Sequence, residues 1–125
     1  MITHVENNTK SKEWLVESVE LVEKRGFTNI KSKLEGYDDP ISFDKKGDET
    51  NYTPDITANG SHGKAYFDIA QKTDDTTSLV SKWKLLSTIA AMKKGKLHII
   101  VPFGQNKFTQ EILEQYDIEA DVIKL

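Results

Sequence analysis

Cysteine is missing from the 125-residue sequence, which excludes disulfide bonds, thiolate metal sites and a cysteine nucleophile. Long apolar runs are missing too: the longest extends over residues 99–103, whereas a membrane helix needs about 20 residues. The first residues show no basic region leading into an apolar stretch, so they do not form a secretory signal. We therefore expect a cytoplasmic protein without a membrane segment.

Arginine is nearly absent, because Arg25 is its only occurrence, and this disfavours bidentate recognition of bases or phosphates. The formal net charge is −3, but the charges are unevenly distributed. Residues 76–110 carry six lysines and no acid, whereas both flanking segments are acidic. This basic stretch predicts either an anion-binding face or a solvated, lysine-rich helix end. The candidate nucleic-acid-binding residues in it are Lys82, Lys84, Lys93 and Lys94.

Several motifs of cofactor and catalytic sites are also absent. The sequence has neither a glycine-rich phosphate-binding loop nor a dinucleotide fingerprint, so we expect no small-molecule cofactor. His4, His62 and His98 are isolated from one another and provide no zinc-ligand spacing. The Ser61-His62 pair lies in a predicted turn and does not suggest a nucleophile with its base.

The apolar periodicity predicts an α/β protein with one domain over residues 11–125, preceded by a flexible segment at 1–10. Residues 38–51 are polar and predict a loop or an irregular hairpin. The predicted order is helix, three strands, helix, strand, helix, strand, with the last two strands parallel. The predicted helices cover 12–25, 78–94 and about 108–116, and the strands lie within 27–37 and at 52–58, 64–72, 97–101 and 121–125.

The most informative segment is a predicted hairpin, because Asn-Gly at the start of the 59–63 turn is a strong hairpin signal. Successive side chains of a strand point to opposite faces. Phe67 and Ile69 therefore share an apolar face that belongs in the core. The other face carries Asp68 and Lys72.

The pairing register of this hairpin decides whether two aspartates meet. If Ala58 pairs with Ala65, Asp55 lies directly opposite Asp68, with the Cβ atoms about 5 Å apart. A register shifted by two residues would place Asp55 opposite Ala70 instead. Two carboxylates that face each other need a cation nearby, which would be Mg²⁺, Mn²⁺ or the lysine of the same face.

The segments Tyr52-Thr53-Pro54-Asp55-Ile56 and Tyr66-Phe67-Asp68-Ile69-Ala70-Gln71-Lys72 resemble the core of PD-(D/E)XK nucleases. This superfamily includes restriction endonucleases and Holliday junction resolvases. Together with the element order, the resemblance covers residues 12–125. It implies a restriction endonuclease-like αβββαβαβ fold, in which helices flank a mixed central sheet. It also implies that Asp55 and a second acid bind Mg²⁺ or Mn²⁺, while Lys72 positions or activates the attacking water.

The sequence departs from the motif at the second acid. That acid should lie two residues before the lysine, where this chain has Ala70. Asp68 lies four residues before Lys72, about 13 Å along a strand instead of about 7 Å. Either Asp68 replaces the missing ligand, or the metal site is lost and the fold remains. The first alternative gives the catalytic set Asp55, Asp68 and Lys72, with the two aspartates as metal ligands.

Three functions follow from these alternatives. The first is a metal-dependent DNA endonuclease that hydrolyses phosphodiester bonds; if it acts on duplex DNA, a homodimer is expected. The second is a catalytically inactive module of the same fold that binds nucleic acid or protein, which the Ala70 departure and the acidic net charge favour. The third is a small acidic immunity or antitoxin-type protein that binds a basic partner.

Overall fold

The computed structural model describes residues 11–44 and 51–125. The segment 1–10, for which the sequence predicts flexibility, lies outside the described residues. In chain order, the elements are α2 (Lys12–Lys24), β1 (Thr28–Ser32), β2 (Phe43–Asp44), β3 (Asn51–Tyr52), β4 (Ile56–Asn59), β5 (Lys64–Ile69), α3 (Thr76–Met92), β6 (Lys96–Val101), α4 (Asn106–Gln115) and β7 (Asp121–Lys124). No helix in this part of the chain is long and apolar enough to cross a membrane.

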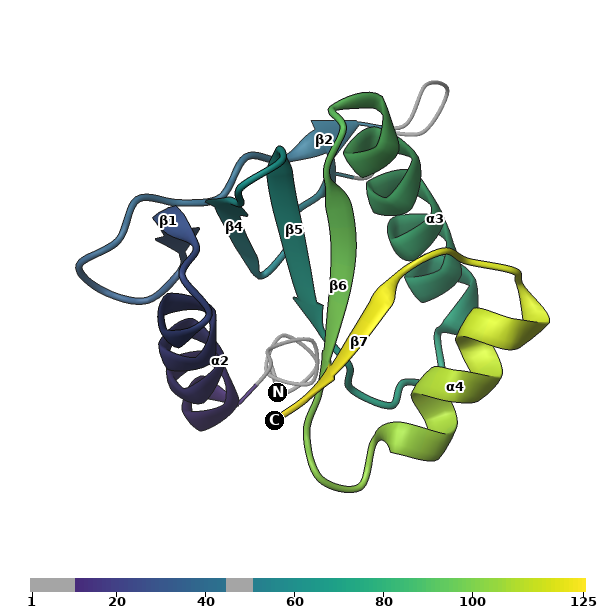
Figure 1. Ribbon diagram of the computed structural model, residues 1–125. Coiled ribbons are helices and arrows are strands. Elements are labelled where there is room, and N and C mark those ends of the chain that lie inside the picture. The colour runs from purple at the N-terminus through teal and green to yellow at the C-terminus, as the bar shows by residue number, and fades with distance from the viewer. Residues whose placement is uncertain (1–10, 45–50) are drawn as a thin grey trace.

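The main sheet has five strands in the order β1-β4-β5-β6-β7 (Figure 1). The pairs β1–β4 and β4–β5 are antiparallel, whereas β5–β6 and β6–β7 are parallel. The prediction of a mixed α/β sheet with a parallel C-terminal pair is therefore confirmed. Strands β2 and β3 form a separate two-stranded hairpin, which flanks the main sheet near α3.

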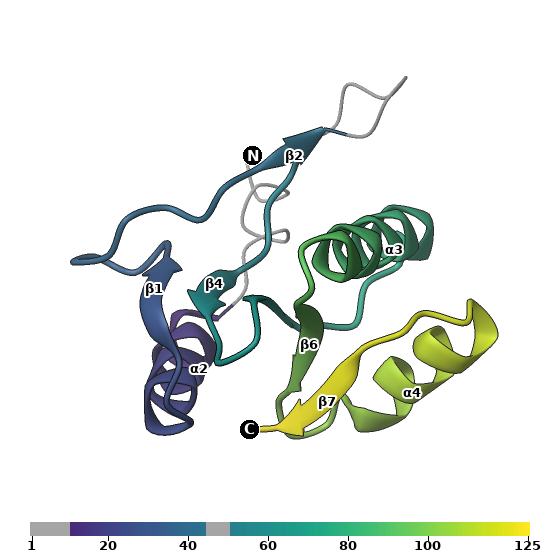
Figure 2. The same ribbon diagram turned by 45° about the horizontal axis from the view of Figure 1, so that its top comes forward.

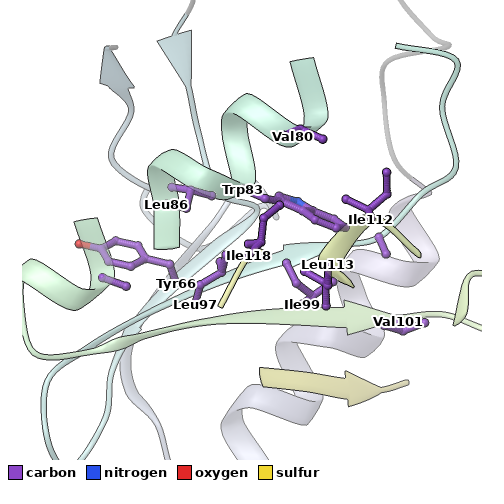
Figure 3. Packing of buried hydrophobic residues seen from close by; sticks show 12 residues of the cluster. Tyr66, Val80, Trp83, Leu86, Leu97, Ile99, Val101, Ile112, Leu113 and Ile118 are labelled. Carbon is purple, nitrogen blue, oxygen red and sulfur yellow. The ribbon is translucent and has the colours of Figure 1, made fainter. Parts of the chain in front are cut away.

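Helices cover both faces of the main sheet: α2 lies on one side, and α3 and α4 lie on the other (Figures 1 and 2). Phe67 of β5 faces α2 and packs in a cluster with Val22. Tyr66, its neighbour, points to the opposite face and packs in a second cluster with Trp83 of α3. Figure 3 shows Trp83 between its helix and the strands. The alternation of the sequence predicts that one face of β5 belongs to the core, but both faces are buried.

The two strands of the β4–β5 hairpin are shorter than predicted. The chain from 52 to 58 is divided, because Tyr52 pairs with Phe43 of β2 and only the residues from Ile56 onward belong to the main sheet. Strand β5 ends at Ile69, and the following main chain leaves the sheet after Ala70 donates its N–H to the Ile100 oxygen at 2.8 Å. Residues 71 and 72 therefore do not continue the alternation of β5.

An aromatic group fills the α2 side of the sheet at the start of β5 and β6. The ring of His98 stacks on Phe67 with centroids 4.7 Å apart, and Phe27 meets both rings edge-on. Burial lowers the pKa of His98 below its usual 6.5, and the charges of Lys96 and Arg25 act in the same direction against Asp121. The folded protein therefore favours the neutral imidazole.

This burial predicts a loss of stability in mild acid. The unfolded state takes up the His98 proton near pH 6.5 and the folded state only at lower pH, so the free energy of unfolding falls as the pH drops below about 6.5. Urea unfolding between pH 5 and 7 measures this slope. His98→Phe should flatten it, because the group that gains the proton on unfolding is removed. Equal slopes in wild type and His98→Phe would contradict the assignment.

Candidate functional site

The register of the β4–β5 hairpin brings two aspartates together. Ala58 pairs with Ala65, as one of the two predicted registers requires, so Asp55 comes opposite Asp68 at the next step along the pair. The main-chain N–H of Asp55 donates to Oδ1 of Asp68 at 3.3 Å. In return, the N–H of Ile69 donates to Oδ2 of Asp55 at 2.8 Å. Each carboxylate is thus held by the main chain of the neighbouring strand.

Asp68 is fully buried, with 0% of its surface exposed, and α3 provides its partners. The Nζ of Lys82 lies 3.0 Å from Oδ1, and the indole N–H of Trp83 donates to Oδ2 at 2.8 Å. The Lys82 side chain is itself only 20% exposed. Asp68 is therefore one half of a buried ion pair, and a buried charge needs such compensation.

The lysine ammonium that lies beside the carboxylates is that of Lys82. The predicted strand to residue 72 is wrong, because β5 ends at Ile69, and the catalytic role of Lys72 stays a prediction. Lys72 lies in the loop after β5, is exposed, and donates its main-chain N–H to Oε1 of Gln105 at 2.7 Å. The strand ends before it can carry Lys72 on the same face as Asp68. Helix α3 crosses that face instead, and its residues 82 and 83 reach down to the carboxylate.

The four lysines predicted to bind nucleic acid do not share one environment. Lys82 is committed to the ion pair with Asp68, and the ammonium of Lys84 lies 5.9 Å from the centre of the Tyr116 ring. Lys93 and Lys94 are exposed just beyond the C-terminal end of α3. At 1.5 Å per helical residue, Lys82 and Lys93 are about 16 Å apart along the axis. The basic stretch of the sequence is thus divided between two ends of the sheet.

The two carboxylates of this site provide part of the ligand set that a divalent cation needs. Asp55 and Asp68 offer carboxylate oxygens, and Mg²⁺ is often held by one or two carboxylates with water and substrate phosphate as its other ligands. Among the described residues, no group of three or more His, Asp or Glu side chains could hold a metal. Both oxygens of Asp68 already accept hydrogen bonds, so a cation would have to compete with Lys82.

Sequence reasoning missed Lys82 and Trp83 as neighbours of the aspartates. One signal was available: a buried indole N–H needs an acceptor, and a buried carboxylate needs donors. Trp83 recurs with Leu79, Leu86 and Ala90 at helical spacing, which places it on the apolar stripe of its helix, and Asp68 is the acid at the centre of the neighbouring strand. Comparison with known protein families, curated proteins and solved structures finds no match to the chain.

The ion pair predicts a strong dependence of stability on Lys82. In Lys82→Met, Asp68 loses the ammonium that lies 3.0 Å from its Oδ1, so the free energy of unfolding should fall by about 3 kcal/mol. Chemical unfolding at neutral pH measures the change. Lys84→Met is the matched control, two residues along the same helix, and should cost about 0.5–1 kcal/mol for its contact with Tyr116.

A double variant isolates the pair. When Asp68→Asn accompanies Lys82→Met, no charge is left uncompensated, so the double variant should lose less stability than the two single losses together. Strict additivity would show that the two side chains do not depend on each other.

Proposed function

We propose that the protein hydrolyses phosphodiester bonds of DNA with a divalent cation, using Asp55, Asp68 and Lys82. One observation carries the proposal: two carboxylates meet across an antiparallel strand pair, and a lysine ammonium lies 3.0 Å from one of them. The order α2, β1, β4, β5, α3, β6, α4, β7 supports the idea that the sheet is a restriction endonuclease-like core. In this proposal Lys82 takes the role that the resemblance assigned to Lys72.

The proposed roles follow from the chemistry of each group. Asp55 and Asp68 would hold Mg²⁺ or Mn²⁺, which lowers the pKa of an attacking water and stabilises charge on the phosphate. The hairpin keeps Asp55 in place through the N–H of Ile69. Lys82 places a positive charge beside the carboxylates, where it stabilises negative charge that develops on the phosphate oxygens. The water would add to phosphorus as the bond to the leaving oxygen breaks; the water would lose a proton to solvent, and the leaving oxygen would take up one proton.

A second function is favoured by the burial of Asp68. A carboxylate that is 0% exposed, with both oxygens engaged by Lys82 and Trp83, acts as a structural ion pair as it stands. The same fold would then bind nucleic acid or protein without cutting it. This alternative needs no metal, and it accounts for Ala70 at the position of the second acid in the resembled motif.

A cleavage assay with labelled duplex DNA and either Mg²⁺ or Mn²⁺ tests the first proposal. Wild type should cut the DNA, and removing the cation with a chelator should stop cleavage. Asp55→Asn should lower the rate at least about 100-fold, because the group that would hold the cation is lost. Lys82→Met should have a similar effect through lost charge stabilisation, whereas Lys72→Met should retain most activity.

Two further measurements separate failure of folding from failure of chemistry. Circular dichroism should show that Asp55→Asn keeps its fold, because this residue is only half-buried. Mn²⁺ calorimetry should show binding by wild type that is lost in the same variant. DNA binding that weakens with salt but brings no cleavage would support the inactive module. The absence of both cleavage and DNA binding would overturn the nuclease proposal and the DNA-binding form of the second function.

A further inference from the structure

The two α3 partners of Asp68 differ in their freedom to move. Trp83 is 0% exposed, and its ring is packed into the cluster between α3 and the strands (Figure 3). The side chain of Lys82 is 20% exposed, and a flexible four-carbon stem carries its ammonium. Of these two partners, Lys82 is therefore the one that can move away from the carboxylate toward solvent while the helix stays in place.

The two oxygens of the Asp68 carboxylate have different surroundings. Oδ2 accepts the indole N–H of Trp83 at 2.8 Å, on the side of the core. Oδ1 accepts the main-chain N–H of Asp55 at 3.3 Å, so it is the oxygen on the side of the second aspartate. A cation held by both aspartates would therefore need Oδ1 of Asp68.

The ammonium of Lys82 lies 3.0 Å from this same Oδ1. Mg²⁺ requires its oxygen ligands at about 2.0–2.1 Å in near-octahedral geometry. A divalent cation and an ammonium in contact with one oxygen would repel each other at short range, and burial leaves this repulsion weakly screened. The cation can bind there only if the ammonium moves away.

The contact between Lys82 and Asp68 already compensates the charge of the buried carboxylate. A buried carboxylate that lacks such compensation is strongly unfavourable. With Lys82 in place, β5 and α3 can pack around Asp68 before any divalent cation binds. The same contact weakens cation binding, because the cation has to replace a charged hydrogen bond.

We propose that Lys82 competes with the divalent cation for Asp68: its ammonium lies beside Oδ1 and leaves when Mg²⁺ or Mn²⁺ binds. The released ammonium would then meet the phosphate of the substrate, which is the role that the proposed function gives it. This inference rests on the proposed function, because it needs a cation between Asp55 and Asp68. It adds that Lys82 limits the affinity of the protein for the cation alone.

Calorimetric titration of Mn²⁺ into the full chain, without DNA, tests the competition. Lys82→Gln removes the charge but keeps an amide that can donate to Asp68, whereas Lys82→Met removes both. Each variant should bind Mn²⁺ at least about tenfold more tightly than wild type, since the cation no longer displaces a charged hydrogen bond. Lys84→Met is the control: it removes one positive charge two residues along α3, at the contact with Tyr116, and should bind Mn²⁺ as wild type does.

Thermal unfolding gives a second measurement that does not depend on cleavage. Mn²⁺ should raise the unfolding midpoint of Lys82→Gln by more than that of wild type, because tighter binding to the folded state stabilises it further. The melting transition also shows that the variant is folded.

Two results would overturn the proposal, and they differ in what they say about the proposed function. If wild type binds Mn²⁺ and both Lys82 variants bind it equally or more weakly, the competition is wrong and the cation site stands. If neither wild type nor the folded Lys82→Gln variant binds Mn²⁺, the competition and the metal-dependent function are both wrong.

Discussion

The charge of Asp68 is the constraint on which the arrangement of the sheet and α3 depends. A carboxylate with no exposed surface is tolerated only when donors surround it, and here the donors come from two separate parts of the chain. Asp55, the residue just before β4, contributes its main-chain N–H, while α3 contributes Lys82 and Trp83. Helix α3 must therefore cross β5 at a fixed position along the strand and with a fixed rotation about its own axis. Apolar packing around Trp83 alone would permit small shifts, but the ion pair selects one of them.

Much of the fold follows from local rules that the sequence displays openly. Asn59-Gly60 marked the hairpin turn, and the pairing of Ala58 with Ala65 was one of two registers that kept Phe67 in the core. The strand ends could not be predicted in the same way. Whether β5 stops at Ile69 or continues depends on partners far along the chain, such as the Gln105 side chain that receives the Lys72 N–H.

The sequence predicts the two acids of the candidate site, but it does not predict which lysine lies beside them. Asp55 and Asp68 are related by strand pairing, which has a simple period and few registers. The approach of Lys82 depends on how a helix packs across a sheet, and sequence periodicity does not set the crossing point. It also depends on the α3-facing side of β5 being buried, although that side carries an acid. The six-lysine segment consequently looked like a single surface, whereas α3 divides it between two ends of the sheet.

The hydrogen bond from Trp83 to Asp68 gives the molecule a built-in optical probe. The emission of an indole responds to the charge and polarity next to its ring, and this indole donates directly to the carboxylate at the centre of the candidate site. Any event that withdraws Asp68 from Trp83 would change that emission without an added label. The second tryptophan, Trp14, lies on α2 across the sheet, so replacing it with phenylalanine would leave a single tryptophan to observe.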